Sequence, residues 1–131
     1  MKVSETKEFE KDLKKLRKKI RSVESDARNA VDEVSGLSAL ELAKWSATDK
    51  LCNPATFQEE GKPRAQIYKL RVGTDNPKTS SRDGVRVWFA VIEEDDPWII
   101  SCGVQPKDKN NKSQQETIIE IKSRISQFYD K

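Results

Sequence analysis

The stretch from Arg64 to Val104 constrains the fold most, because it is richer in β-branched and aromatic residues than the rest of the chain. Its runs RAQIYKLRV, GVRVWFAVIEED and WIISCGV have the length and composition of strands, and turn-forming residues separate them. Successive side chains of a strand point to opposite faces. The runs therefore predict three strands of one antiparallel sheet, with an apolar face that holds Tyr68, Leu70, Val72, Val85, Val87, Phe89 and Val91.

The opposite face of this predicted sheet carries cations. Lys69 and Arg71 are two residues apart in the first strand, and Arg86 has the same orientation in the second. Because burial of an unpaired cation is costly, we expect this face to be open to water or to an anion. Lys69, Arg71 and Arg86 are thus a candidate phosphate-binding surface.

Before the sheet, the periodicity is helical. Apolar residues recur from Phe9 to Val34 at spacings of four and three, and neither glycine nor proline interrupts them. This pattern predicts one long helix over residues 6–35. A helical hairpin with its break around residues 22–26 is the alternative. Gly36 is expected to end the helix in the left-handed conformation.

Two capping-box patterns predict further helices. The first, at residues 38–41, begins a helix that runs to about Asp49, with Leu40 and Ala43 facing inward and Leu42 and Trp45 as further candidates for the inward side. The second, at residues 113–116, begins a C-terminal helix with one apolar side, formed by Ile118, Ile121, Ile125 and Phe128. Between the helix that begins at residues 38–41 and the sheet, Asn53-Pro54 ends helical order. Residues 52–63 are expected to be an irregular connector anchored by Phe57.

Composition narrows the class of protein. A chain of 131 residues fits one domain, which we take as residues 1–131. The net charge of +3 permits nucleic acid as a partner, and the absence of histidine removes the commonest general base and metal ligand. Cys52 and Cys102 lack metal-ligand spacing and are expected to be reduced and buried. No apolar run approaches the roughly 20 residues of a membrane span, and no signal peptide is evident, so a cytoplasmic protein is expected.

The order of these segments carries a resemblance to a known family. EFEKDLKKL, a helical region, a strand that ends in YKLRV, the strand GVRVWFAVIEE and the strand WIISCGV follow one another along nearly the whole chain. In this order the chain resembles the RelE/ParE superfamily of toxins from bacterial toxin–antitoxin pairs. The resemblance implies an α+β, RelE-like fold in which N-terminal helices pack on a small antiparallel sheet, with a C-terminal helix near the antitoxin-binding surface. It also implies a short edge strand at residues 1–5 and a first helix shorter than the periodicity predicts.

The function implied is that of a RelE-like toxin, a ribosome-associated endoribonuclease that cleaves mRNA, inhibits translation and is silenced by a cognate antitoxin protein. In this reaction the 2′-hydroxyl of RNA attacks the adjacent phosphate, and fixed cations neutralise the charge that develops, without a metal or a small-molecule cofactor. The resemblance matches Lys69 and Arg86 to residues of the family's site. We assign Lys69 as candidate base or phosphate ligand, because neighbouring positive charges disfavour its protonated form, and Arg71 and Arg86 as a clamp on the phosphate.

The last strand departs from the family pattern. Members often have an arginine just after S-x-G and a tyrosine or histidine beyond it, whereas here Ser101-Cys-Gly103 is followed by VQP. Lys107 and Lys109 are the cations that would take the place of these family residues. Two alternatives therefore stay open: a ParE-like inhibitor of DNA gyrase, which needs no catalytic groups, and a non-catalytic binding domain of the same fold.

A second basic segment, KDLKKLRKKIR, covers residues 11–21. Its residues Lys14, Lys15, Lys18 and Arg21 stand off the apolar stripe, and we assign them to contacts with RNA phosphates. An ordinary solvated helix face is the alternative. The polar loop of residues 73–83 is either a solvated loop or a contact arm that brings Lys78 and Arg82 near the phosphate-binding face.

Overall fold

A computed structural model describes residues 1–46, 48, 50–107 and 113–130. Within them the chain forms a five-stranded sheet and four helices, so the predicted α+β class with a C-terminal helix is confirmed. In chain order the elements are β1 (Val3–Glu5), α1 (Lys7–Leu16), α2 (Val23–Ser35), α3 (Ala39–Trp45), β2 (Leu51–Phe57), β3 (Ala65–Val72), β4 (Val85–Ile92), β5 (Trp98–Pro106) and α4 (Gln114–Tyr129). None of the helices within the described part of the chain is long and apolar enough to cross a bilayer.

The sheet is mixed rather than purely antiparallel. Its strand order is β1-β5-β4-β3-β2, and the neighbours from β5 to β2 are antiparallel, which confirms the three predicted strands. The N-terminal edge strand that the resemblance implies also forms, but it runs parallel to β5, with Val3 opposite Ile99. Because β1 ends at Glu5, opposite Ser101, no strand within the described residues pairs with the rest of β5 on that side.

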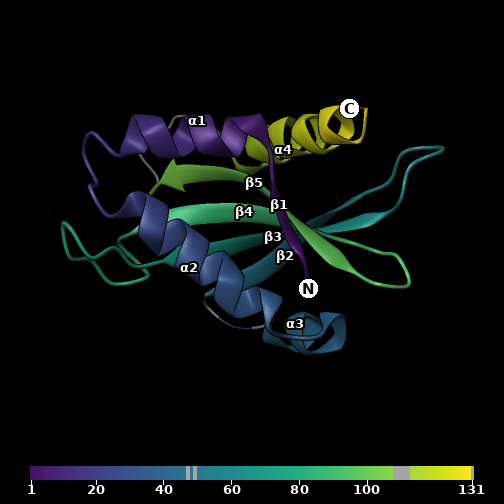
Figure 1. Ribbon diagram of the computed structural model, residues 1–131, viewed down its shortest axis with the longest axis horizontal. Coiled ribbons are helices and arrows are strands. Elements are labelled where there is room, and N and C mark those ends of the chain that lie inside the picture. The colour runs from purple at the N-terminus through teal and green to yellow at the C-terminus, as the bar shows by residue number, and fades with distance from the viewer. Residues whose placement is uncertain (47, 49, 108–112, 131) are drawn as a thin grey trace.

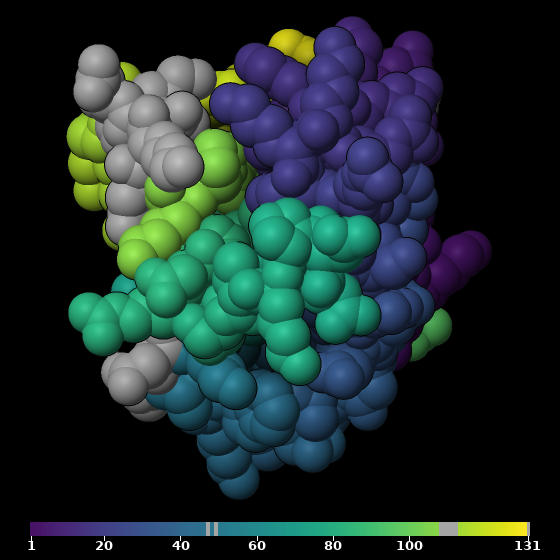
Figure 2. All heavy atoms as spheres, turned by 90° about the vertical axis from the view of Figure 1, so that its left-hand side faces the viewer, coloured from purple at the N-terminus to yellow at the C-terminus, as the bar shows by residue number. Residues whose placement is uncertain are grey.

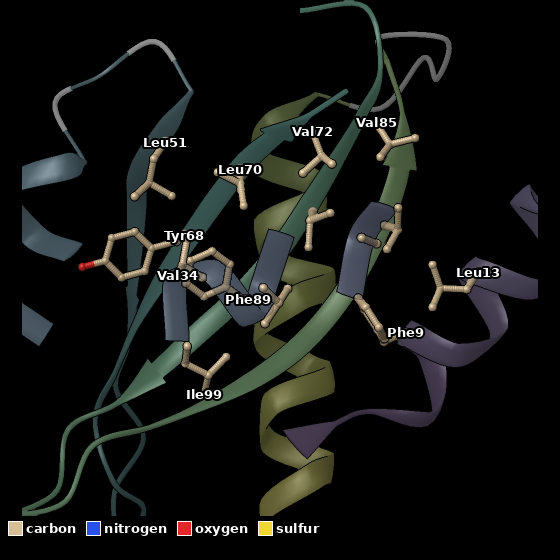
Figure 3. Close-up of a cluster of buried hydrophobic side chains, with 14 of the residues drawn as sticks. Phe9, Leu13, Val34, Leu51, Tyr68, Leu70, Val72, Val85, Phe89 and Ile99 are labelled. Atoms are coloured by element: carbon tan, nitrogen blue, oxygen red, sulfur yellow. The ribbon is translucent and has the colours of Figure 1, made fainter. Parts of the chain in front are cut away.

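Helices cover both faces of the sheet (Figure 1). Helices α1 and α2 pack over the predicted apolar face, and Figure 3 shows Phe9, Leu13 and Val34 from these helices in one buried cluster with residues of the sheet. Helix α4 lies on the opposite face, where Ile118, Ile121 and Ile125 pack with Trp88. The predicted apolar sides of both the sheet and α4 are therefore confirmed.

The prediction of one long helix over residues 6–35 is wrong, and the hairpin is correct. Helix α1 ends at Leu16 and α2 begins at Val23, so the break lies at residues 17–22, mostly before the predicted one. A straight helix of 30 residues is about 45 Å long, whereas an eight-residue strand is only about 27 Å long. The turn folds the second half of the apolar stripe back onto the sheet, and Val23, Ala27, Val31 and Val34 are consequently buried.

The connector between α3 and the sheet differs from its prediction. Residues 51–57 form strand β2, although they contain Pro54. Proline is tolerated there because β2 is an edge strand whose pairing with β3 shifts register between Cys52 and Ala55. Pro54 has no amide hydrogen to donate to β3, but the neighbouring Asn53 side-chain amide donates a hydrogen bond to the Ile67 carbonyl at 2.7 Å. Phe57 is buried, as predicted.

The predicted capping residues at the helix starts are confirmed, whereas the predicted helix ends are less accurate. Ser38 and Glu41 form the full capping box, and Ser113 accepts a hydrogen bond from the Glu116 amide. Helix α3 already ends at Trp45. Of its candidate inward residues Leu42 is buried, whereas Leu40, Ala43 and Trp45 are exposed. Gly36 caps α2 in a right-handed conformation, with φ of −75°, so the left-handed prediction is wrong.

The packing of α1 generates a first prediction. Leu13 is 1% exposed in the core beneath α1, so Leu13→Ala is expected to lower the free energy of unfolding by about 2–5 kcal/mol. The matched control is Leu40, which is 68% exposed, and Leu40→Ala is expected to change stability by less than about 0.5 kcal/mol. Urea unfolding followed by circular dichroism measures both. Equal losses in the two variants would contradict the observed placement of α1 and α3.

Candidate nucleic-acid interface

Sheet register places the three predicted site cations on one face in two adjacent rows. Lys69 of β3 lies opposite Trp88 of β4, and Trp88 lies opposite Gly103 of β5. In the next row Arg71 lies opposite Arg86, and Arg86 lies opposite Gln105. The shared face of Lys69, Arg71 and Arg86 follows from strand alternation, and the register makes them neighbours.

Arg86 does not present its charge to solvent. It is 6% exposed, and its guanidinium donates hydrogen bonds to the carbonyls of Ser81, at 3.3 Å, and Arg82, at 2.9 Å. The expectation that this face is open is therefore wrong for Arg86, because the loop before β4 folds over it and supplies acceptors. While these bonds hold, Arg86 fixes the loop and makes no contact with a phosphate at the surface.

Lys69 and Arg71 remain partly exposed. The Lys69 ammonium donates to Gln114 Oε1 at 2.6 Å, at the start of α4, and lies 5.8 Å from the centre of the Trp88 ring. The Arg71 guanidinium makes no ion pair with any residue that the structure describes. Lys69 and Arg71, which we call the β3 cations, are thus the accessible part of the predicted site.

The basic segment at the end of α1 and in the turn after it lies at the same end of the molecule as the loop of residues 73–84. Lys14, Lys15, Lys18 and Arg21 are exposed, as predicted. Figure 2 looks at this end, with α1 and its following turn at upper right, the loop across the middle and the end of β5 beside it. Lys78 and Arg82 are exposed in that loop. We call this end of the molecule, which carries Lys14, Lys15, Lys18, Arg21, Lys78 and Arg82, the basic end.

Of the two cations predicted after β5, Lys107 lies among the described residues. Lys107 forms an ion pair with Asp83 of the loop, and the hydrogen bond from Lys107 lowers the pKa of the Asp83 carboxyl. This pair links the end of β5 to the loop of residues 73–84, so Lys107 is not an unpaired cation. Lys109 lies outside the described residues.

A pocket of about 780 Å³ opens at the basic end, and sequence reasoning missed it. It lies between the end of α1, the loop of residues 73–84, the end of β5 and one side of α4, with Trp88 in its lining. Its residues come from four distant segments, so no local sequence signal marks it. The turn at residues 17–22, which the long-helix prediction excluded, places the Lys19 and Ile20 side chains in its wall.

One wall of the pocket is an ion pair that joins α1 to α4 across β5. Arg124 of α4 donates to Asp12 of α1 at 3.0 Å and to the Cys102 carbonyl at 2.9 Å, while Asp12 accepts from the Val104 amide at 3.0 Å. We call this arrangement the Asp12–Arg124 clasp. Gly103 permits it, because a Cβ atom at Gly103 would lie 2.4 Å from Arg124 Nη1.

Other groups with catalytic potential lie elsewhere. The Tyr129 hydroxyl donates to the Pro63 carbonyl at the C-terminal end of α4, and burial raises the pKa of Tyr129 to about 12. Burial likewise raises the pKa of the Cys102 thiol to about 12, whereas Cys52 is partly exposed, contrary to prediction. Within the described ranges, no cluster of histidine, cysteine, aspartate and glutamate could hold a metal ion.

Comparisons of the chain with protein-family models, with curated protein sequences and with solved structures find no match.

The clasp generates a second prediction. Gly103→Ala forces the Arg124 side chain away from Asp12 and is expected to lower the free energy of unfolding by about 1–3 kcal/mol. In an Arg124→Ala background the same substitution no longer meets the guanidinium, so its cost is expected to be smaller, with the contact to Asp12 Oδ2 at 3.1 Å still present. A double-mutant cycle by urea unfolding measures the coupling. Additive costs would contradict the clasp.

The burial of Arg86 generates a third prediction. Arg86→Met retains an unbranched apolar stem but removes the donors to the loop carbonyls, so stability is expected to fall by about 1–3 kcal/mol. Amide hydrogen exchange in residues 79–85 should become faster. Arg71→Met, at the directly opposed and partly exposed position, is the control and should leave both measurements nearly unchanged. An equal response of the two variants would rule out this role for Arg86.

Proposed function

We propose that this protein is a RelE-like toxin of a toxin–antitoxin pair, a cytoplasmic, ribosome-associated endoribonuclease that cleaves mRNA and is silenced by a cognate antitoxin protein. The observation that carries the proposal is the gathering of accessible cations at one end of the molecule. The segments that carry these cations, namely the end of α1 with the turn after it, the loop of residues 73–84 and the end of β3, come together at this end (Figure 1).

Charge distribution favours a polyanionic partner at the basic end. Lys14, Lys15, Lys18 and Arg21 make no ion pair with a described carboxylate, so their charge is available to phosphates. The exposed carboxylates of residues 93–96 lie in the β4–β5 connection, at the opposite end of the molecule (Figure 1). An RNA backbone at the basic end is therefore attracted without facing that acidic turn.

Two features of the fold agree with what the resemblance implies. The chain begins with a short edge strand, β1, and its first helix is short and turns into a second. Both features precede the strands that carry YKLRV, GVRVWFAVIEE and WIISCGV. A third helix, α3, also precedes the sheet strands, so the agreement with the resemblance covers these two features and not the whole order of helices.

The roles of the three predicted catalytic residues are revised by their surroundings. Lys69 stays the candidate base or phosphate ligand, and Arg71 is the accessible cation beside it. Arg86 acts as a positioning residue, which holds the loop of residues 81–85 through its carbonyl contacts. Cleavage by this set requires no metal, since attack by the 2′-hydroxyl needs proton transfer and stabilisation of the charged phosphate.

A gyrase inhibitor of the ParE type is the second candidate. The burial of Arg86 favours it, because this removes one of the three cations from the phosphate surface. Val104 and Gln105 in place of the expected arginine favour it as well. A ParE-like protein binds its target through surface complementarity, and the exposed basic end serves that purpose without catalytic groups.

Cell-free translation with mapping of mRNA 5′ ends tests the proposal. The wild-type protein is expected to generate new 5′ ends that appear only when ribosomes are present. Lys69→Ala should slow the cleavage by about 10²-fold, the size of effect expected when a group that acts in the transition state is removed. Lys44→Ala alters an exposed lysine on α3 and is the matched control, with unchanged cleavage expected.

The same assay separates the alternatives. Intact mRNA combined with inhibition of purified DNA gyrase would support the ParE-like candidate and overturn the endoribonuclease. Intact mRNA with active gyrase would leave only a non-catalytic binding domain. Cleavage that persists at the wild-type rate in Lys69→Ala would remove Lys69 from the chemistry.

A further inference from the structure

The cations that line the pocket at the basic end differ in their ion pairs. Arg124 pairs with Asp12 and Glu120, and Lys107 pairs with Asp83. Lys15 and Lys19 also line the pocket, and both are exposed. Neither lysine makes an ion pair with a residue in the described part of the chain. An anionic group beside Lys15 and Lys19 would therefore meet two cations without a carboxylate partner among the described residues.

The interior of the pocket suits a flat, largely apolar group with a few polar atoms. Leu16, Ile20 and Ile121 supply apolar surface. Gln105 and Thr117 supply polar groups, and the hydrogen bond between them, at 3.2 Å, fixes their orientation. A volume of about 780 Å³ lies within the usual range for sites that enclose a small organic group.

Strand addition by a peptide is blocked at this edge of the sheet. In the part of the chain that the structure describes, no strand pairs with the outer side of β5 beyond Ser101, but the clasp already occupies two of its polar groups. The Cys102 carbonyl accepts from Arg124, the Val104 amide donates to Asp12, and Pro106 has no amide hydrogen. An extended peptide would have to break these contacts before its backbone could pair with β5.

We infer that this pocket receives one unstacked nucleotide of a single-stranded RNA, with the base between the apolar walls and an adjoining phosphate at Lys15 and Lys19. This inference rests on the proposed function and adds to it a binding site separate from the β3 cations. Proteins that read single-stranded RNA take splayed bases into such pockets and hold the backbone with cations.

Trp88 connects this nucleotide site with the β3 cations. The Trp88 side chain lines the pocket, and the Lys69 ammonium lies 5.8 Å from the centre of its ring. One RNA strand that passes the start of α4 therefore meets Lys69 and Arg71 on one side and the pocket on the other. The pocket then selects a nucleotide near the one whose phosphate lies at the β3 cations.

Titration of the ¹⁵N-labelled full-length protein with a 2′-O-methyl trinucleotide tests the inference, because this RNA lacks the attacking hydroxyl and is not cleaved. Chemical-shift changes are expected at Leu16, Gln105 and Thr117. A trinucleotide with an abasic central position should bind roughly tenfold more weakly, the effect expected from loss of one base contact.

Two pairs of lysines with equal spacing on the same segment provide the variants. The Lys15→Ala, Lys19→Ala double variant should weaken binding of the trinucleotide and lower the dependence of log affinity on log salt concentration by about 0.7, the change expected when one phosphate contact to a single strand is lost. The Lys7→Ala, Lys11→Ala double variant is the matched control, because both residues are exposed on α1 but do not line the pocket. Its affinity and salt dependence should equal those of the wild type.

The outcomes separate this inference from the proposed function. Binding confined to the β3 cations, with affinity unaffected by Lys15→Ala and Lys19→Ala, would overturn the nucleotide pocket and leave the endoribonuclease proposal standing. No RNA binding in any form would overturn both. Shift changes in the pocket caused by an acidic peptide and not by the trinucleotide would assign the pocket to a protein partner and contradict the inference.

Discussion

The packing of the helices in this molecule depends on how the backbone polar groups at the outer edge of β5 find hydrogen-bond partners. Strand β1 covers only the first residues of β5, so the remaining backbone groups need other partners. The Asp12–Arg124 clasp provides them at Cys102 and Val104, and it draws one helix from each face of the sheet to the same edge. The clasp closes this edge to a further strand and forms the wall against which the pocket opens, with Gly103 as the residue that makes room for it.

Local patterns in the sequence predicted the strands, the capped helix starts and the apolar side of α4, because each depends on residues within a few positions of one another. They failed where distant segments decide the outcome. The stripe from Phe9 to Val34 is equally consistent with a long helix and a hairpin, and only the length of the sheet selects the hairpin. Arg86 was placed on the correct face, but its burial depends on loop carbonyls that alternation does not reveal. The clasp joins residues 112 positions apart and has no local signature.

The same distant contacts shape the functional interpretation. The turn after α1 exposes its lysines beside the loop of residues 73–84, and the end of β5 brings Gln105 to the same place. Positive charge thus collects around a hollow instead of spreading over a flat sheet face. In our proposal the β3 cations meet the reactive phosphate, the pocket receives a neighbouring nucleotide, and the basic end provides the attraction that is independent of RNA sequence.

Ultraviolet crosslinking of the protein to translating ribosomes, with identification of the crosslinked peptides by mass spectrometry, tests the central claim most directly. That claim is that RNA lies against the basic end. The account predicts crosslinks to RNA within residues 14–21 and 105–107 and none within the acidic turn of residues 93–96. Crosslinks concentrated in α3 or in the acidic turn, with the basic end unmodified, would contradict it.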